Sequence, residues 1–460
     1  MAWGLGLALP AMLRGELIGT PWTDLYPSVW GLWWFVQEQP GLPVWCTSLG
    51  APEGMPFYYS SPLHGWAAWP LMGLLGVGTT WNLLVVAARV ATVLCSYGAG
   101  RAWGLSDGGA LVAAAVYGCS PYFQGYAVEG IVEGLDGWTL AVWLWLVARD
   151  RWRTASVAFA LTIVSSWYLG AAACVLAVFI KRGWSSALLG FVLASPLLGE
   201  FLGAFPGVGA MDPEIRTLMG ARPGLWSPGI VSDYPLAMTG WIGIAGPLLA
   251  LYAARSRPWV ALSAVTLLVL ATGVGPWFEL PGFNAVRFPY RFIAGALVGI
   301  AFLAGLATER AWVAPLIVLE GLLLSPIQPV LPGSPADVDP VYAQLQGEVL
   351  LDIPGLAAMP PGEINLTRKR ARYVLYAQTV HGMGSPWVPD FNSVGVLATD
   401  GLDGVRALDD PSVTEVHIPE SVDWVVLHPA DIPGSRVRPL LEADGWTLQH
   451  RSDNAEAWSR

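Results

Sequence analysis

The stretch "GTPWTDLYPSVWGLWWF", residues 19–35, places one carboxylate, Asp24, among four tryptophans, one tyrosine and two prolines. A carboxylate next to so much apolar surface costs free energy unless it has a hydrogen-bond or ionic partner, so its presence needs an explanation. Either Asp24 caps the helix that follows it, since aspartate is a favoured N-cap residue, or it is a functional group. The aromatic residues of 26–39 predict a helix lying along a membrane surface, where Trp and Tyr are enriched.

The composition around this stretch indicates a membrane protein. Of the 460 residues, 54% are hydrophobic, 13% are charged and 25 are tryptophan. Soluble domains average about 25% charged residues, so half that fraction with many tryptophans points to contact with lipid. The net charge of −10 argues against a nucleic-acid partner, because binding a phosphate backbone needs clustered Lys and Arg. The four cysteines form no disulfide or metal pattern.

Apolar runs bounded by charges predict about ten to eleven membrane spans. A helix needs about 20 apolar residues to cross the hydrocarbon core, and some runs are shorter than that. We expect a mainly α-helical, polytopic transmembrane bundle over residues 1–329, with the fifth and sixth runs split at "SSWY". The runs lie roughly at 1–13, 81–100, 108–124, 137–148, 154–165, 167–180, 184–205, 237–254, 258–275, 291–308 and 311–329.

The loops between these runs differ in charge on the two sides of the membrane. Basic residues such as Arg101, Arg149 and Arg257 fall on one side, which the positive-inside rule makes cytoplasmic. Acidic residues such as Asp24 and Glu133 fall on the other side. This pattern predicts that the N-terminus lies in the cytoplasm and that the C-terminal tail lies outside.

The tail is different in kind from the bundle. From about residue 330 the chain is charged and has short periods, which predicts a small α/β domain over residues 330–460 outside the membrane. The expected strands lie at 347–355, 371–380, 413–419, 422–429 and 445–452, and the expected short helices at 339–346, 403–410 and 436–445.

The second outside loop, "YAVEGIVEGLDGW", holds three carboxylates. Glu129 and Glu133 are four residues apart, so a helix would place both on one face. Together with Asp136 they are either a solvated turn or ligands for a hard divalent cation such as Mg²⁺ or Mn²⁺, which takes carboxylate oxygens. The spacing alone does not separate the two interpretations.

The segment "LPGFNAVRFPYRF" places Arg287 and Arg291 four residues apart just before a late span, on the outer side. Arginines there run against the positive-inside bias. They either snorkel to lipid head groups or clamp an anionic head group, because the planar guanidinium grips phosphate with two parallel hydrogen bonds. We favour the clamp, since both arginines lie on the same side as Asp24.

Two further segments and one tryptophan supply candidate binding residues. "SSWYLG" would place Trp167 and Tyr168 at the outer end of a short hairpin, where their rings could stack on a sugar or anchor the interface. The outside loop 211–235 carries Asp233 and is long enough to form a lid or an acceptor groove. Trp22 is a further aromatic candidate for holding the lipid or the sugar. The lone histidines are assigned no catalytic role.

The order of these segments resembles the GT-C superfamily of polytopic membrane glycosyltransferases, in its divergent bacterial branch with a C-terminal extracytoplasmic domain. The resemblance spans most of the chain, and the order of the segments is more specific than any one of them. The segments that carry it are "PWTDLYPSVWGLWW", "VYGCSPYFQGYAVEG", "SSWYLG", "LPGFNAVRFPYRF" and "DPVYAQLQGEVLLDIPG…YVLYAQTVHG".

The resemblance implies an enzyme that takes a sugar from a polyprenyl-phosphate donor and transfers it outside the membrane to a lipid, glycan or protein acceptor. It implies that Asp24 is the catalytic aspartate of the first outside loop and takes the proton of the acceptor hydroxyl. Arg287 and Arg291 would stabilise charge on the leaving phosphate. The second loop lacks the D-x-D of such enzymes, and its acidic residue would be Glu129, Glu133 or Asp136.

Two other functions remain open from the sequence. A transporter or lipid flippase would carry ionisable residues within its spans, and the clear examples are Arg89, Glu200 and Glu320. A non-catalytic assembly or sensor protein could use the outside domain to bind a glycan or a protein. Acidic residues gather in the outside loops instead of the spans, which favours the glycosyltransferase.

Overall fold

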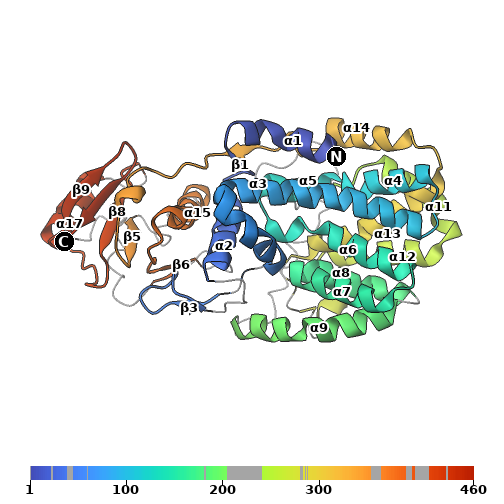
Figure 1. Cartoon of the computed structure of the whole chain (residues 1–460), viewed down its shortest axis with the longest axis horizontal. Helices are drawn as coiled ribbons and strands as arrows, with labels where there is room; N and C mark the ends of the chain where they lie inside the picture. Colours follow the sequence, from blue (N-terminus) through green and yellow to red (C-terminus); the bar gives the residue numbers. More distant parts are fainter. Residues whose placement is uncertain are drawn as a thin grey trace. The chain divides into compact units, whose positions relative to one another are not determined.

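The computed structural model describes residues 2–21, 24–38, 45–57, 59, 61–180, 183–204, 241–279, 283–284, 286, 288–353, 364–389, 396–398, 414–430 and 434–460. The chain divides into two compact units (Figure 1). Unit 1 comprises Met1–Thr20 and Tyr59–Ser334, and unit 2 comprises Pro21–Tyr58 and Pro335–Arg460. The segment Pro21–Tyr58, which the sequence analysis assigns to an outside loop of the bundle, therefore clusters with the C-terminal residues.

Unit 1 is helical apart from one short strand pair. Strands β1 (Leu17–Ile18) and β4 (Gly333–Ser334) pair antiparallel and bring the two ends of the unit together. The helices are α1 (Ala2–Leu13), α3 (Pro62–Ala102), α4 (Asp107–Gly118), α5 (Pro121–Glu129), α6 (Gly137–Ala148), α7 (Trp152–Ser165), α8 (Trp167–Phe179), α9 (Gly183–Ala204), α11 (Ala245–Ala253), α12 (Pro258–Ala271), α13 (Ile293–Ala307) and α14 (Val313–Leu324), with 3₁₀ turns η1 (Val132–Gly134), η4 (Ala254–Ser256), η5 (Pro276–Glu279) and η6 (Pro289–Phe292).

Helix α3 is about twice as long as the expected run 81–100. It begins at Pro62, because proline suits the first helical position, and ends at Ala102. Its continuity is interrupted at Gly76, whose φ of 74° and ψ of 166° are not helical. Glycine adopts a positive φ without steric cost, so the first part of α3 changes direction there.

The break expected at "SSWY" is present. Helix α7 ends at Ser165 and α8 begins at Trp167. Ser166 between them is extended (φ −164°, ψ 121°), and its hydroxyl accepts a hydrogen bond from the backbone N–H of Leu169. A serine N-cap of this kind ends one helix and starts the next, so 154–165 and 167–180 are two helices.

The expected count of ten to eleven spans is not matched helix for helix. Of the helices that the structure describes, two are long and apolar enough to cross a membrane, Pro62–Ala102 and Pro289–Ala307. Four others are apolar but shorter: Trp167–Phe179, Gly183–Gly199, Pro258–Ala271 and Val313–Leu324. At 1.5 Å per residue a helix of about 13 residues spans roughly 20 Å, less than the hydrocarbon core of about 30 Å.

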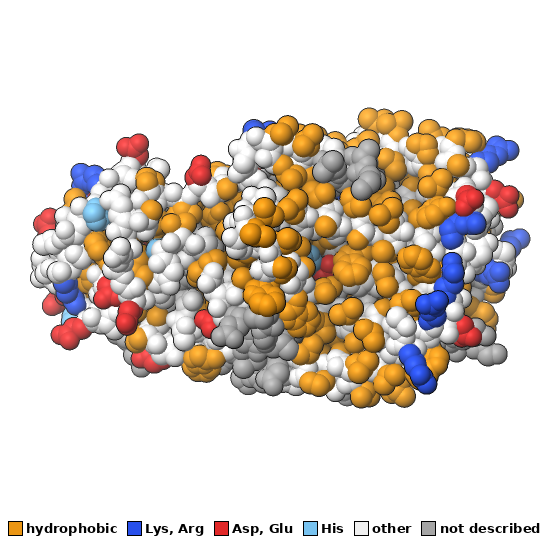
Figure 2. All heavy atoms as spheres, viewed as in Figure 1, with side chains coloured by type: hydrophobic (Ala, Val, Ile, Leu, Met, Phe, Trp, Pro, Cys, Tyr) orange, Lys and Arg blue, Asp and Glu red, His pale blue; other side chains and the backbone are white. Residues whose placement is uncertain are grey.

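The surface of unit 1 is apolar over a wide area. Figure 2 shows hydrophobic side chains covering the helices, with Lys and Arg gathered along one end of the helical unit. Leu74, Leu251 and Leu323 are each at least 70% exposed. Large apolar side chains exposed in such numbers require an apolar surrounding.

Unit 2 packs α2 (Leu25–Gln37) against α15 (Ile364–His381). Trp30 Nε1 donates to the Gln378 side-chain oxygen at 2.7 Å, and the Gln378 amide donates to the Ser48 carbonyl at 2.9 Å. Tyr26 stacks on Tyr376 with ring centroids 5.0 Å apart. The expectation that residues 26–39 form an interfacial helix is therefore wrong, because Trp30 and Trp34 of α2 are fully buried in unit 2.

The sheet of unit 2 has the strand order β5 (Leu350–Ile353), β8 (Trp424–Leu427), β10 (Glu456–Ser459), β9 (Thr447–Arg451). β5 and β8 are parallel, and the other pairs are antiparallel. Alternate side chains point to opposite faces. One face, with Leu351, Val425 and Trp458, packs on α17 (Gly434–Ala443) through Val437 and Leu441. The other face packs on Ala377 of α15 through Leu350, Val426 and Ala457.

The expected strands 347–355, 422–429 and 445–452 and the expected helix 436–445 are confirmed by β5, β8, β9 and α17. The expected strand 371–380 is wrong, since it forms the second half of α15. This stretch is buried on two sides, by α2 and by the sheet, and so lacks the polar face that marks a helix in sequence. Residues 414–419 form no strand, 339–346 form only the 3₁₀ turn η7 (Tyr342–Gln344), and 403–410 lie outside the described residues.

Unit 2 also contains two short strand pairs away from this sheet. β2 (Trp45–Cys46) pairs with β3 (Met55–Pro56), and β6 (Trp387–Pro389) pairs with β7 (Val396–Ala398).

Candidate functional site

The strongest concentration of functional groups in unit 1 surrounds Arg291. This residue lies in η6, which Pro289 starts and which runs directly into α13. Its side chain is only 8% exposed, and Nη1 forms an ion pair with the Glu133 carboxylate. A buried charge is tolerated only with such a partner, and Glu133 is the counter-ion of this guanidinium.

Three aromatic rings enclose the same guanidinium. The Arg291 carbon Cζ lies 4.5 Å from the Tyr168 ring centroid, 4.7 Å from that of Phe288 and 5.9 Å from that of Tyr290. The negative face of an aromatic ring attracts a cation. The Tyr168 hydroxyl also accepts a hydrogen bond of 3.2 Å from the Phe288 backbone N–H, which ties the start of α8 to the segment before α13.

Two tyrosines of α5 form the wall behind Arg291. Ser120 caps α5 and Pro121 occupies its first position, so Tyr122 and Tyr126 fall four residues apart on one face. Their hydroxyls are 2.8 Å apart, and the Tyr122 hydroxyl donates to the Arg291 carbonyl at 3.3 Å. The polar edge of each ring therefore faces the arginine.

These groups surround a small cavity. Its walls include Tyr122, Tyr126, Glu133, Tyr168 and Arg291, and its volume is about 10 Å³. This is room for about one water molecule.

The three carboxylates of the second loop have separate environments. Glu129 is the last residue of α5 and is buried, while Glu133 lies in η1 and contacts Arg291. Asp136 precedes α6 and is 1% exposed. Among the residues that the structure describes, no three His, Cys, Asp or Glu side chains lie close enough to hold a metal ion. The residues present do not fit the Mg²⁺ or Mn²⁺ site that the spacing left open.

Asp136 belongs to a buried hydrogen-bond network that sequence reasoning missed. One carboxylate oxygen accepts from Trp138 Nε1 at 2.9 Å. The other lies 3.1 Å from His64 Nδ1 and accepts from the Ser61 hydroxyl at 3.3 Å. Both Ser61 and Asp136 contact the same ring nitrogen of His64, which differs from the arrangement of a Ser-His-Asp triad. The network ties the start of α3 to the start of α6.

Asp24 lies in unit 2, at the N-cap position of α2. Its side chain makes no capping hydrogen bond, and its backbone carbonyl accepts from the Ser28 N–H at 2.8 Å. The carboxylate is partly exposed. Capping by the side chain therefore does not explain this aspartate, and its catalytic role stays a prediction.

The remaining candidates are placed as follows. Trp167 is the first residue of α8 and is half-buried. Trp22, Asp233 and Arg287 lie outside the described residues. The structure thus brings Glu133, Tyr168 and Arg291 together, which no sequence spacing indicates. The aromatic partners Tyr122, Tyr126 and Tyr290 carry only a weak signal, the clustering of aromatic residues in "YFQGY" and "FPYRF".

Two of the charged residues expected within the spans, Glu320 and Arg89, form hydrogen bonds inside unit 1. The Glu320 carboxylate of α14 accepts hydrogen bonds from the backbone N–H groups of Ile244 and Ala245, the latter at 3.0 Å. It therefore satisfies donors at the start of α11, where a negative charge is favoured. Arg89 in α3 donates to the Gln124 side chain at 3.4 Å. The side chain of Glu200 lies outside the described residues.

No protein-family model and no curated protein matches the sequence. Solved structures do match. The arabinofuranosyltransferase AftD from mycobacteria has a TM-score of 0.57 at 16% identity, over 99% of this chain and 40% of AftD. ArnT from Cupriavidus metallidurans has a TM-score of 0.53 at 13% identity, over 99% of this chain and 97% of ArnT.

The archaeal oligosaccharyltransferase AglB from Archaeoglobus fulgidus, solved with an inhibitory peptide and a dolichol-phosphate, has a TM-score of 0.50 at 12% identity. That match covers 96% of this chain and 71% of AglB. These proteins are GT-C membrane glycosyltransferases, and this chain has their fold. Identities this low establish the fold alone, and the chain spans about 40% of the length of AftD.

Proposed function

We propose that the chain is an integral-membrane glycosyltransferase that moves a sugar from a polyprenyl-phosphate donor to an acceptor outside the membrane. The observation that carries this proposal is the buried Arg291, enclosed by three aromatic rings and paired with Glu133, in a chain with a GT-C fold. The dolichol-phosphate bound to AglB supports a lipid phosphate as the partner. The acceptor is a lipid, a glycan or a protein.

In this mechanism Arg291 receives the phosphate of the donor. The phosphate displaces the Glu133 carboxylate, and one charge pair replaces another without leaving a buried cation alone. The guanidinium then stabilises the charge that develops on the phosphate as the sugar departs. One preorganised donor of this kind contributes about 10²–10³-fold to the rate. Arg287 is proposed as the second arm of this clamp, and Trp167 and Tyr168 as the aromatic surface for the sugar.

The bond changes follow from the base assigned to Asp24. Its carboxylate takes the proton of the acceptor hydroxyl, and the hydroxyl oxygen forms a bond to the anomeric carbon. The bond from that carbon to the phosphate oxygen breaks, and polyprenyl phosphate leaves with the electron pair. Attack opposite the leaving group inverts the configuration. A positioned base contributes about 10²–10⁴-fold to such a reaction.

The same proposal places the chain in a bacterial cytoplasmic membrane, with the basic end of unit 1 in the cytoplasm and residues 330–460 outside. The basic residues at one end of the helical unit (Figure 2) support this orientation. Asp24 and the second loop would then face the compartment that receives the sugar.

The test uses membranes that contain the full chain and labelled polyprenyl-phosphate hexose or pentose. Label is followed into lipid, glycan and protein fractions for the native chain, Asp24→Asn and Arg291→Lys. Matched controls are Glu53→Gln, an exposed carboxylate of unit 2, and Arg153→Lys, which lies over the Trp152 ring at 5.4 Å. We expect transfer by the native chain and both controls only. Full transfer by a folded Asp24→Asn protein would overturn the base assignment.

The second candidate function, a transporter or flippase, is disfavoured by Glu320, whose carboxylate serves the start of α11. If no donor sugar is transferred by the native chain while labelled lipid-linked glycan crosses the membrane, the transporter is the better account. If neither happens, a non-catalytic assembly protein is the better account.

A further inference from the structure

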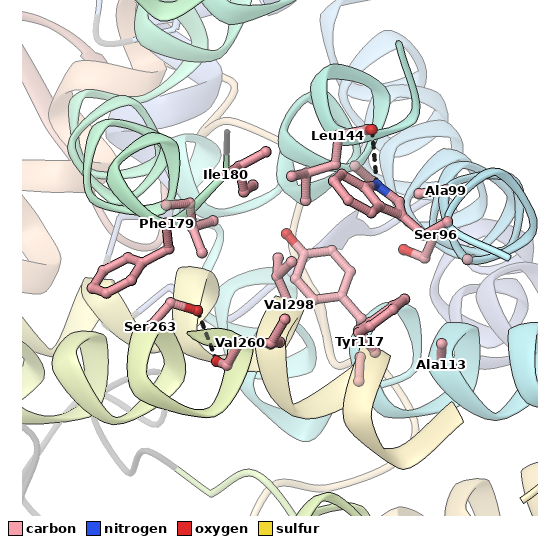
Figure 3. A pocket seen from close by; sticks show the side chains of 17 residues that line it. Ser96, Ala99, Ala113, Tyr117, Leu144, Phe179, Ile180, Val260, Ser263 and Val298 are labelled. Carbon is pink, nitrogen blue, oxygen red and sulfur yellow. Dashed lines mark hydrogen bonds between the residues drawn. The ribbon is translucent and has the colours of Figure 1, made fainter. Parts of the chain in front are cut away.

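An apolar cavity of about 110 Å³ lies within unit 1, away from Arg291. Six helices form its wall: α3, α4, α6, α8, α12 and α13 (Figure 3). The Tyr117 ring, Phe179 and Val298 project into the space from three of them. The cavity is partly open to its surroundings.

The polar groups in the wall are already satisfied. The Tyr117 hydroxyl donates to the Gly137 carbonyl at 3.0 Å, and the Ser263 hydroxyl donates to the Val260 carbonyl at 2.8 Å. Trp103 Nε1 donates to the Leu144 carbonyl at 3.0 Å (Figure 3). A cavity needs unsatisfied polar partners to hold water, and apolar cavities of about 150 Å³ stay dry and bind hydrocarbons. The chemistry of the wall therefore fits a hydrocarbon ligand.

The cavity lies near the basic end of the helical unit. Gly100 and Trp103 line it from the last turn and the C-cap of α3, and Val260 lines it from the first turn of α12. Trp103 is 37% exposed and packs edge-on against Phe302, with centroids 6.3 Å apart.

The basic side chains at the ends of these helices are exposed. Arg149 follows the last residue of α6, and Arg257 precedes the first residue of α12. Arg101, near the end of α3, pairs with Asp107 at 2.9 Å. Figure 2 shows basic side chains gathered along one end of the unit. A ligand with an apolar chain and an anionic head would be complementary to the cavity and to this end together.

We infer that the cavity binds a segment of one fatty-acyl chain of an anionic phospholipid, whose phosphate lies among the arginines at the ends of α6 and α12. The inference rests on the membrane placement of the proposed function but not on its chemistry. It assigns a lipid site to the leaflet at the basic end of unit 1, and the donor phosphate at Arg291 is a separate site. A lipid bound there would fill space that otherwise lacks packing contacts.

The test is photocrosslinking of the full chain in nanodiscs. The probes are phosphatidylglycerol and phosphatidylcholine, each with a diazirine in one acyl chain, and crosslinked peptides are mapped. Ala113→Phe and Val298→Phe fill the cavity. Leu111→Phe on the same helix is the matched control, since Leu111 is 42% exposed to the outside. Folding of each variant is checked by gel filtration and thermal melting.

We expect phosphatidylglycerol to crosslink to peptides that contain Trp103, Leu144 and Phe302, about tenfold more than phosphatidylcholine does. Both filling variants should remove these crosslinks, and Leu111→Phe should keep them. Arg149→Gln with Arg257→Gln should erase the preference for phosphatidylglycerol.

Crosslinks that survive both folded filling variants would show ordinary annular lipid and overturn the inference. Equal labelling by the two phospholipids would overturn the anionic head group. Displacement of the probe by polyprenyl phosphate, but not by unlabelled phosphatidylglycerol, would overturn the assignment to a phospholipid. None of these readouts depends on sugar transfer, so failure here and failure of the proposed function are distinguishable.

Discussion

Arg291 and Glu133 form an ion pair across 158 residues of sequence, and the guanidinium of that pair is packed over the Tyr168 ring at 4.5 Å. The pair joins η1, before α6, to η6, before α13. Glu133 is more exposed than Arg291, 24% against 8% for the side chains. The carboxylate is therefore the partner that can move away, and the guanidinium is the fixed one.

A double-mutant cycle tests this pair. We expect Glu133→Gln alone to destabilise the protein, because it leaves a buried cation without its counter-ion. The double variant Arg291→Met with Glu133→Gln should lose less stability than the sum of the losses of the two single variants. The coupling should be about 0.5–3 kcal/mol, read from unfolding in detergent. Strict additivity of the two changes would mean that the pair contributes nothing to the fold.

The Asp136 network predicts a structural effect. Asp136→Asn removes the charged acceptor of bonds from Trp138, Ser61 and His64, and should lower the free energy of unfolding by about 1–3 kcal/mol. Asp107→Asn, at an exposed carboxylate paired with Arg101, should cost under about 1 kcal/mol. Thermal melting compares the two. Equal melting temperatures for both variants and the native chain would contradict the role given to the network.

The Glu320 contact predicts a structural role, at the start of α11, and not a role in transport. Glu320→Gln should weaken the start of α11 by about 0.5–2 kcal/mol while transfer per folded molecule is retained. Glu309→Gln, an exposed carboxylate outside α14, is the control. Loss of transfer in a Glu320→Gln protein with native stability would show that this carboxylate acts in function instead.

The Gln378 contacts predict how firmly the N-terminal segment of unit 2 is held. Gln378→Leu removes the acceptor of Trp30 and the donor to Ser48, and each buried group left unsatisfied costs about 1–3 kcal/mol. Hydrogen exchange over Leu25–Gln37 should then speed up while exchange over α17 stays unchanged. Gln344→Leu, at an exposed side chain of η7, should alter neither region.

A pH effect follows from His381 at the end of α15. Burial lowers the pKa of His381 to about 4, and the nearby Asp352 offsets this in part. The ring also stacks on Tyr342 at 5.4 Å. In the unfolded chain a histidine has a pKa of about 6.5. Between pH 6.5 and 4 the unfolded state binds more protons, so the stability of unit 2 falls as the pH falls through this window.

The measurement is the unfolding midpoint of unit 2 in the full chain from pH 7 to pH 4. His381→Gln should flatten the decline, and His417→Gln, at a side chain 79% exposed, should leave the slope close to native. A native decline that His381→Gln does not change would assign the acid sensitivity to other groups.

Several features of the fold could be predicted because their cause is local. The break between α7 and α8 follows from a serine cap before two aromatic residues, and β5, β8 and α17 follow from short apolar periods bounded by turn residues. The long α3 could not be predicted from hydropathy, because its first part depends on Pro62 and on the positive φ of Gly76.

The site was predicted in its parts and not in its assembly. The sequence indicates Arg291, Glu133 and Tyr168 separately, but nothing in their spacing joins η6, η1 and α8, which are far apart in the chain. His64 was set aside as a lone histidine, because its partner Asp136 is distant in sequence. The tryptophans of α2 suggested a membrane surface, since composition does not distinguish an interface from the interior of a small domain.

Unit 2 is assembled from two pieces of chain, with Tyr59–Ser334 of unit 1 encoded between them. This has a consequence for biosynthesis. Trp30 and Gln378 are 348 residues apart, so at about 5–20 residues per second the glutamine is made roughly 20–70 s after the tryptophan. During that interval α2 lacks its partner helix α15 and can pack only on the early residues of unit 2, such as Phe57. A ribosome that stalls within unit 1 would release a chain whose α2 has no α15 to pack against.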